Sequence, residues 1–131
     1  MSKSEALRDD LARAVERLDE ACRRVGVPPV EDELLRDGLI QRFEFSFELA
    51  WKAVQAVAAE EGVTLRSPKS ALAHALQSGW VGDEGIWFRM LEARNLSSHT
   101  YAEAVAAELA REIPGFVDPL RVLVRALRAR R

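Results

Sequence analysis

The sequence is poor in several residue types that would mark a particular chemistry or location. It has one cysteine, two histidines and one tyrosine among 131 residues. The single cysteine, Cys22, excludes an internal disulfide and the metal sites built from several cysteines, and its place on an apolar helix stripe favours a buried structural thiol. No apolar run reaches the roughly 20 residues that cross a membrane, and the first residues lack the apolar core of a secretion signal. We therefore expect a cytoplasmic protein without a membrane partner.

The chain also lacks a strong excess of charge of either sign. Nineteen basic and 21 acidic residues give a formal charge of −2, so binding of a polyanion would need a local basic patch. Apolar residues are plentiful, at 48% of the total, which suits a folded core. The length fits a single domain, residues 1–131.

Helical patterns run through the whole chain, and no β-hairpin signal or internal repeat is present. The fold class that we predict is all-α, an up-and-down four-helix bundle with additional short helices. Cap and break signals set its boundaries. The first predicted helix covers about 4–25 and is ended by Gly26 and Pro28–Pro29, and the second covers about 31–61. A short third helix follows Ser67–Pro68 and ends at Ser78–Gly79, and a fourth begins at Asp83. The fifth runs from near Tyr101, where Thr100 and Glu103 have the spacing of a capping box, to Pro114–Gly115, and the last begins at Phe116.

The second predicted helix is apolar around most of its circumference. At 100° per residue from Phe43, the side chains of Glu44, Glu48, Lys52 and Gln55 fall within roughly 100–180°, and nearly every other residue up to Ala58 is apolar. Such a helix is either central to the bundle or covered on a second side by another subunit, and we favour a homodimer because a small bundle encloses few positions. The residues expected at this bundle or dimer interface are Phe43, Phe45, Phe47, Leu49 and Trp51.

The stretch RNLSSHTY, Arg94–Tyr101, stands between the fourth and fifth predicted helices. Its asparagine and serines favour caps and turns, so the helix is expected to break there, and a break can bring Arg94 and His99 together. Arg94 lies on the inward stripe with Met90 and Leu91, where a guanidinium needs a carboxylate or a phosphate. Arg94 therefore either forms a structural ion pair, for example with an acidic residue of the second predicted helix, or belongs to an anion-binding site.

His99 precedes a predicted helix N-terminus, where an anion is favoured. A phosphate held there would have Arg94 to neutralise it and a histidine to move a proton, which matches metal-free RNA cleavage. A two-fold dimer axis would double this small site. The alternative role for His99 is a capping histidine that is hydrogen-bonded to the backbone. The alternative for Tyr101 is a packed aromatic ring with an accessible hydroxyl.

Three other features are weaker candidates for function. Glu44 and Glu48 have a spacing that can hold a metal, but no histidine follows and Glu48 pairs well with Lys52, so we expect no metal site. His74 lacks an evident partner and is expected at the surface. Five C-terminal arginines either complement a helix dipole or form a patch for RNA or a protein; they are Arg121, Arg125, Arg128, Arg130 and Arg131.

Three segments, in order, resemble the nucleotidyltransferase substrate-binding proteins of the HEPN superfamily, which are similar to the HepT-like toxins of HEPN/MNT toxin–antitoxin modules. The segments are RFEFSFELAWK (42–52), SPKSAL (67–72) and MLEARNLSSHTY (90–101). The similarity spans about residues 34–127. Its most specific element is an R-x4-H-x-Y motif with a polar residue after the arginine.

The resemblance implies a HEPN-like homodimer in which two R-x4-H segments meet across a cleft, in complex with a separate minimal nucleotidyltransferase. Arg94 would stabilise a phosphate, His99 would be the acid–base group, Asn95 would orient them, and Tyr101 would accept AMP from the partner, which silences the ribonuclease. The chain would need no cofactor of its own, since ATP and magnesium belong to the partner. The alternative is a non-catalytic subunit that presents a substrate to the nucleotidyltransferase; the Arg94–His99 pair favours the toxin, and the modest net charge slightly favours the subunit.

Overall fold

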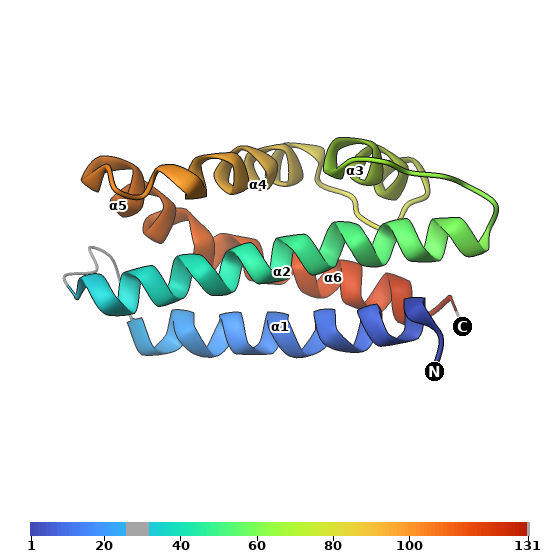
Figure 1. The fold of residues 1–131 in the computed structure, drawn as a ribbon, viewed down its shortest axis with the longest axis horizontal. Helices are drawn as coiled ribbons and strands as arrows, with labels where there is room; N and C mark the ends of the chain where they lie inside the picture. The colour runs from blue at the N-terminus through green and yellow to red at the C-terminus, as the bar shows by residue number, and fades with distance from the viewer. Residues whose placement is uncertain (26–31, 131) are drawn as a thin grey trace.

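A computed structural model describes residues 1–25 and 32–130, and every regular element in these ranges is helical. The predicted all-α fold class is therefore confirmed (Figure 1). The predicted break at Gly26 and Pro28–Pro29, the predicted start at Glu31, and Arg131 lie outside the described residues. The elements are α1 (Lys3–Val25), α2 (Glu33–Glu60), α3 (Pro68–Gln77), α4 (Glu84–Leu96), the 3-10 helix η1 (Ser97–His99), α5 (Glu103–Glu112), the 3-10 helix η2 (Ile113–Phe116) and α6 (Val117–Arg128).

The two longest helices, α1 and α2, run antiparallel along the length of the molecule (Figure 1). α6 packs against both, and α3, α4 and α5 lie on the opposite side of α2 from α1. α2 contacts each of the other five α-helices and is the central element of the bundle. None of the helices in the described ranges is long and apolar enough to span a membrane.

Local capping hydrogen bonds set the starts of three helices, two of which, at Ser67–Pro68 and at Asp83, were predicted. The Asp32 carboxylate accepts hydrogen bonds from two backbone N–H groups of the first turn of α2, and Asp83 accepts one from Ile86 at 3.1 Å. Ser67 and Ser70 form a reciprocal capping box at α3, with Pro68 as its first residue. These starts follow from short-range hydrogen bonds that the sequence already encodes.

The capping box predicted at Thr100 and Glu103 is wrong. α5 begins at Glu103, its N-cap is Ala102, and no side chain caps it. The reason is a competing long-range partner, because the Glu103 carboxylate binds Arg36 of α2 instead of turning back to the backbone at Thr100.

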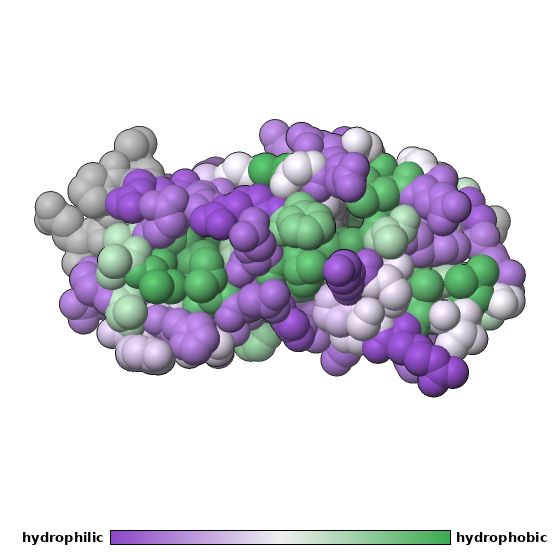
Figure 2. Space-filling model, turned by 90° about the horizontal axis from the view of Figure 1, so that it is seen from above, coloured by the Kyte–Doolittle hydropathy of each residue, from purple (hydrophilic) through white to green (hydrophobic). Residues whose placement is uncertain are grey.

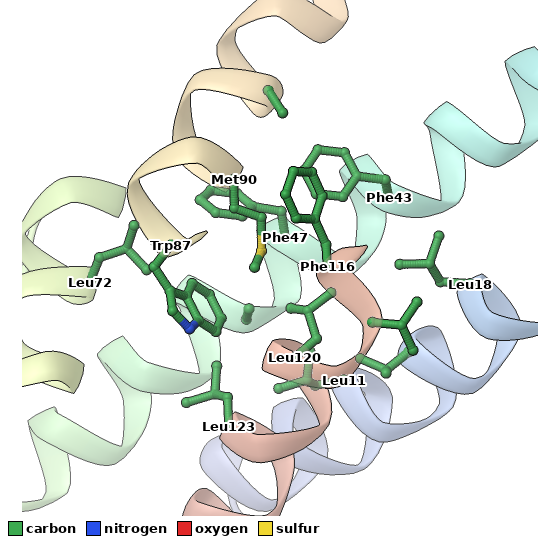
Figure 3. Packing of buried hydrophobic residues seen from close by; sticks show 14 of the residues in the cluster. Leu11, Leu18, Phe43, Phe47, Leu72, Trp87, Met90, Phe116, Leu120 and Leu123 are labelled. Carbon is green, nitrogen blue, oxygen red and sulfur yellow. The ribbon is translucent and has the colours of Figure 1, made fainter. Parts of the chain in front are cut away.

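The hydrophobic core explains most of the apolar surface of α2. Phe43 and Phe47 are completely buried within the chain, and the Phe43 ring lies 5.3 Å from that of Phe116 (Figure 3). The sequence argument had preferred a second subunit as the cover for this face, whereas the chain itself buries these two side chains. Trp87 and Met90 of α4 close the same core.

Only part of the predicted interface remains accessible. Phe45 is 55% exposed, Leu49 is half-buried, and Trp51 is half-buried with its indole N–H donating to Glu48 at 3.0 Å. Phe88 of α4, which is 54% exposed, borders a separate groove of about 500 Å³ between α3 and α4. Figure 2, which looks onto the α3–α5 side, shows hydrophobic side chains exposed between polar ones.

Two of the sparse residues have packing roles. Cys22 is half-buried against the core, and burial raises the pKa of its thiol to about 11, which makes it an unreactive thiol at neutral pH. His74 is half-buried rather than at the open surface, because its ring meets the edge of Trp80 at 5.2 Å.

Arginines tie the ends of the bundle together. Arg8 is buried and donates to the carbonyl of Leu127 at 3.1 Å, which fixes the start of α1 to the end of α6. Arg121 of α6 binds Glu16 and Asp19 of α1, and Arg130 binds Glu61 and stacks on Trp80. Of the C-terminal arginines in the described ranges, only Arg125 and Arg128 make no ion pair, which leaves few free charges for the basic patch considered as an alternative.

The Arg121–Glu16 pair predicts a pH dependence of stability. Hydrogen bonding from Arg121 holds the pKa of the Glu16 carboxyl below its ordinary value, so this pair stabilises the fold above about pH 4.3 and loses its effect as the pH falls through the lowered pKa. Between about pH 5 and about pH 3, the melting temperature of the wild type should fall more steeply than that of Arg121→Met. Thermal melts followed by circular dichroism measure both slopes, and parallel slopes would contradict the assignment.

Candidate active site

The site is built on the break between α4 and α5, which the sequence predicted. α4 ends at Leu96 and the chain continues as a 3-10 turn through His99. Ser97 is buried, and its hydroxyl donates to Glu44 of α2 at 3.0 Å and to the carbonyl of Arg94 at 2.7 Å. Glu44 therefore holds the break against the central helix.

Arg94 has the carboxylate partner that its position on the inward stripe requires. Its Nε and Nη2 donate to the same Glu48 oxygen at 3.2 and 2.8 Å, and its Nη1 donates to the side-chain oxygen of Asn95 at 3.3 Å. This is the structural pair with an acid of the second helix that sequence reasoning considered. About a third of the Arg94 side chain is exposed, and of its three hydrogen bonds the one from Nη1 to Asn95 is the exposed one.

Glu48 contacts three side chains in this part of the site: Arg94, Trp51 and Lys52. Its second oxygen accepts from the Trp51 indole and lies 3.9 Å from Lys52 Nζ, so the predicted Glu48–Lys52 pair exists as a minor contact. Glu44 and Glu48 are thus occupied by Ser97 and Arg94. In residues 1–25 and 32–130 no group of three or more His, Cys, Asp or Glu side chains is arranged to hold a metal ion.

His99 and Tyr101 form an exposed pair. The His99 Nδ1 and the Tyr101 hydroxyl lie 3.2 Å apart, and the two rings meet edge to face with their centres 5.8 Å apart. Tyr101 is 84% exposed, so it is not the packed aromatic side chain of the alternative interpretation. The histidine and the tyrosine are both open to a macromolecular partner.

The four motif residues are therefore organised as two pairs. Arg94 contacts Glu48 and Asn95, while His99 contacts Tyr101. Within the described part of the chain, no hydrogen bond joins Arg94 to His99. A shared anion between these two side chains remains a prediction.

Sequence reasoning missed one contact beside the site, the pair between Arg36 and Glu103. The Arg36 guanidinium donates to both Glu103 oxygens at 2.5 and 2.9 Å, and this hydrogen bonding lowers the pKa of Glu103. The signal was available, because Arg36 shares the buried stripe of α2 with Leu39 and Phe43, at i+3 and i+7. The same argument that demanded a partner for Arg94 demands one for Arg36.

The structure places the R-x4-H-x-Y segment at the α4–α5 connection of an all-helical bundle, the fold that the resemblance to HepT-like proteins implies. The chain belongs to the nucleotidyltransferase substrate-binding protein family: the family described as "Nucleotidyltransferase substrate binding protein like" matches residues 8–129. This match extends the predicted similarity into α1, as most of that helix lies within it.

Relatives of known sequence and structure agree with this assignment. A Haemophilus influenzae protein named "Probable ribonuclease HepT" is 30% identical over 108 residues, which cover 79% of this chain and 74% of the relative. A crystal structure from Thermus thermophilus is 32% identical, with a TM-score of 0.78 over 90% of this chain and 98% of that one. A Haemophilus influenzae structure, described as the fold of a substrate-binding domain of a nucleotidyltransferase, is 26% identical, with a TM-score of 0.81 over 92% and 98% of the two chains.

Proposed function

We propose that this chain is a cytoplasmic, metal-independent endoribonuclease toxin of the HepT type, silenced by AMP transfer to Tyr101 from a separate minimal nucleotidyltransferase. The observation that carries the proposal is the exposed His99–Tyr101 pair in the segment that also carries Arg94, with 3.2 Å between the histidine nitrogen and the tyrosine hydroxyl. The name of the Haemophilus influenzae relative, a ribonuclease, supports the same activity.

RNA cleavage at this site requires an acid–base group and a cation. The 2′-hydroxyl oxygen of one nucleotide attacks the adjacent phosphorus, and the bond to the 5′-oxygen breaks to leave a 2′,3′-cyclic phosphate and a 5′-hydroxyl. His99 takes the 2′-hydroxyl proton or supplies the proton to the leaving oxygen. Arg94 stabilises the charge that develops on the phosphorane, through the part of its guanidinium that Glu48 leaves accessible.

The contact between His99 and Tyr101 gives the silencing step a direct physical basis. The Tyr101 oxygen attacks the α-phosphorus of ATP, the bond to pyrophosphate breaks, and the phenol proton passes to His99 Nδ1. ATP and magnesium are bound by the nucleotidyltransferase. The product carries a bulky phosphodiester next to the histidine, which excludes an RNA phosphate from the same position.

We also propose that the active form is a homodimer in which a second copy covers Phe45 and Leu49. Phe45 is the most exposed apolar side chain of the α2 interface segment, and it lies in a groove of about 420 Å³ that Glu48 and Leu49 also line. This groove adjoins the Arg94 site through Glu48. A two-fold contact here would bring two Arg94 side chains near one cleft.

Phe45→Glu should convert the dimer into a monomer without unfolding the bundle, because the phenyl ring is exposed in the single chain. Phe88→Glu is the matched control, since Phe88 is 54% exposed but borders the separate α3–α4 groove. Multi-angle light scattering measures the mass of both variants. A monomeric wild type, or dissociation by Phe88→Glu and not by Phe45→Glu, would refute this interface.

A second candidate function is a non-catalytic subunit that binds a substrate for the nucleotidyltransferase. It is favoured by the engagement of Arg94 with Glu48 in the single chain, which is the arrangement of a structural ion pair. The description of the Haemophilus influenzae structure points the same way. RNA cleavage by unmodified protein separates the two candidates, since only the toxin cleaves.

A further inference from the structure

The Arg36–Glu103 pair links the first turn of α2 to the segment that carries His99 and Tyr101. Arg36 is only 6% exposed and donates two hydrogen bonds to Glu103, the first residue of α5. Tyr101 stands two residues before Glu103. Ala102, between them, donates its backbone N–H to the carbonyl of His99 at 3.0 Å. A short path of contacts therefore runs from α2 to both residues of the exposed pair.

The start of α5 has no side-chain cap, although Val105 and Ala106 of its first turn pack against the core. Its N-cap is Ala102, which offers no side-chain acceptor, and Thr100 does not cap the helix. In the described ranges, Arg36 is the side chain that anchors the first turn through Glu103. Removal of this anchor would release the turn next to Tyr101.

The pair is poorly suited to stabilise the fold. The Arg36 Nε is buried without a hydrogen-bond partner, while the side chain of Glu103 is 71% exposed. Burial of a guanidinium is costly, and its replacement by an apolar side chain of similar size is often neutral or stabilising. The burial of Arg36 is therefore better explained by what the side chain holds in place than by a contribution to stability.

We propose that Arg36 is a positioning residue that acts through Glu103 to fix His99 and Tyr101 for the chemistry of the site. The proposal rests on the proposed function, because its readouts are AMP transfer and RNA cleavage. Positioning acts on the rate of the chemical step, since a small displacement of the reacting group removes the benefit of a fixed orientation.

Arg36→Met should keep or raise the melting temperature and yet lower kcat for AMP transfer to Tyr101 by at least about tenfold, with little change in KM. Arg36→Lys keeps one charged hydrogen bond and should recover part of kcat. Arg121→Met is the matched control, because it breaks an interhelical arginine–carboxylate pair between α6 and α1, neither of which carries a motif residue, and should leave kcat unchanged. A wild-type kcat in Arg36→Met would overturn the proposal, and so would a loss of stability as large as that of a core truncation.

Hydrogen exchange separates this inference from the proposed function. Peptides that cover residues 97–106 should exchange faster in Arg36→Met than in the wild type and in Arg121→Met, as measured by mass spectrometry. Equal exchange would overturn the positioning role even if the protein is an active toxin. If the wild type neither accepts AMP nor cleaves RNA, the proposed function fails, and faster exchange would still support Arg36 as the anchor of the segment.

Discussion

His99→Ala is expected to abolish RNA cleavage, with a loss of about 10²–10⁴-fold in rate. The histidine is the acid–base group in the proposed mechanism, and its exposure lets an RNA phosphate reach it. Its ring is not part of the hydrophobic core, so the substitution should leave the fold intact. Single-turnover cleavage of an end-labelled RNA measures the rate.

The other histidine provides a matched control for this experiment. His74 of α3 packs against Trp80, which lies in the connection between α3 and α4. Because His74 has no role in the proposed mechanism, His74→Ala should cleave RNA at the wild-type rate. Equal activity in His99→Ala and the wild type would point to a contaminating nuclease and would remove His99 from the mechanism.

Tyr101→Phe is expected to abolish AMP incorporation completely. The change deletes the oxygen that forms the new bond to phosphorus and keeps the aromatic ring. Because Tyr101 is 84% exposed, its hydroxyl contributes little to packing. Cleavage should be retained within a few-fold, since the tyrosine only hydrogen-bonds to His99 in the unmodified protein.

The measurement is incorporation of radioactive AMP from ATP labelled at the α-phosphorus, together with the intact mass of the product. In the presence of the nucleotidyltransferase and ATP, the wild type should lose cleavage while Tyr101→Phe keeps it. Undiminished AMP incorporation into Tyr101→Phe would assign the acceptor to another residue.

Local signals in the sequence predicted the features that depend on neighbouring residues. Ser67 and Asp83 start helices because the hydrogen bonds that their side chains accept close within a single turn, and Pro68 suits the first position of α3. The break after Leu96 follows from the same kind of local preference. The motif residues could also be identified from the sequence, because their order along the chain resembles that of the family's R-x4-H-x-Y motif.

Features that depend on distant residues were beyond such reasoning. Thr100 and Glu103 have the correct spacing for a capping box, but Arg36, 67 positions earlier, competes successfully for the carboxylate. Phe43 and Phe47 suggested an exposed apolar face because the number of helices packed around α2 could not be read from its pattern. The pairing of Arg94 with Glu48 was predicted as a type of contact, while the identity of the acid required the fold.

The most direct test of the account is cleavage of a labelled RNA by the wild-type protein in the presence of EDTA, after intact-mass analysis has established that Tyr101 is unmodified. We predict cleavage with 2′,3′-cyclic phosphate ends. No cleavage by protein of verified mass and dimeric state would contradict the ribonuclease proposal and would leave the exposed His99–Tyr101 pair as a surface that serves the nucleotidyltransferase.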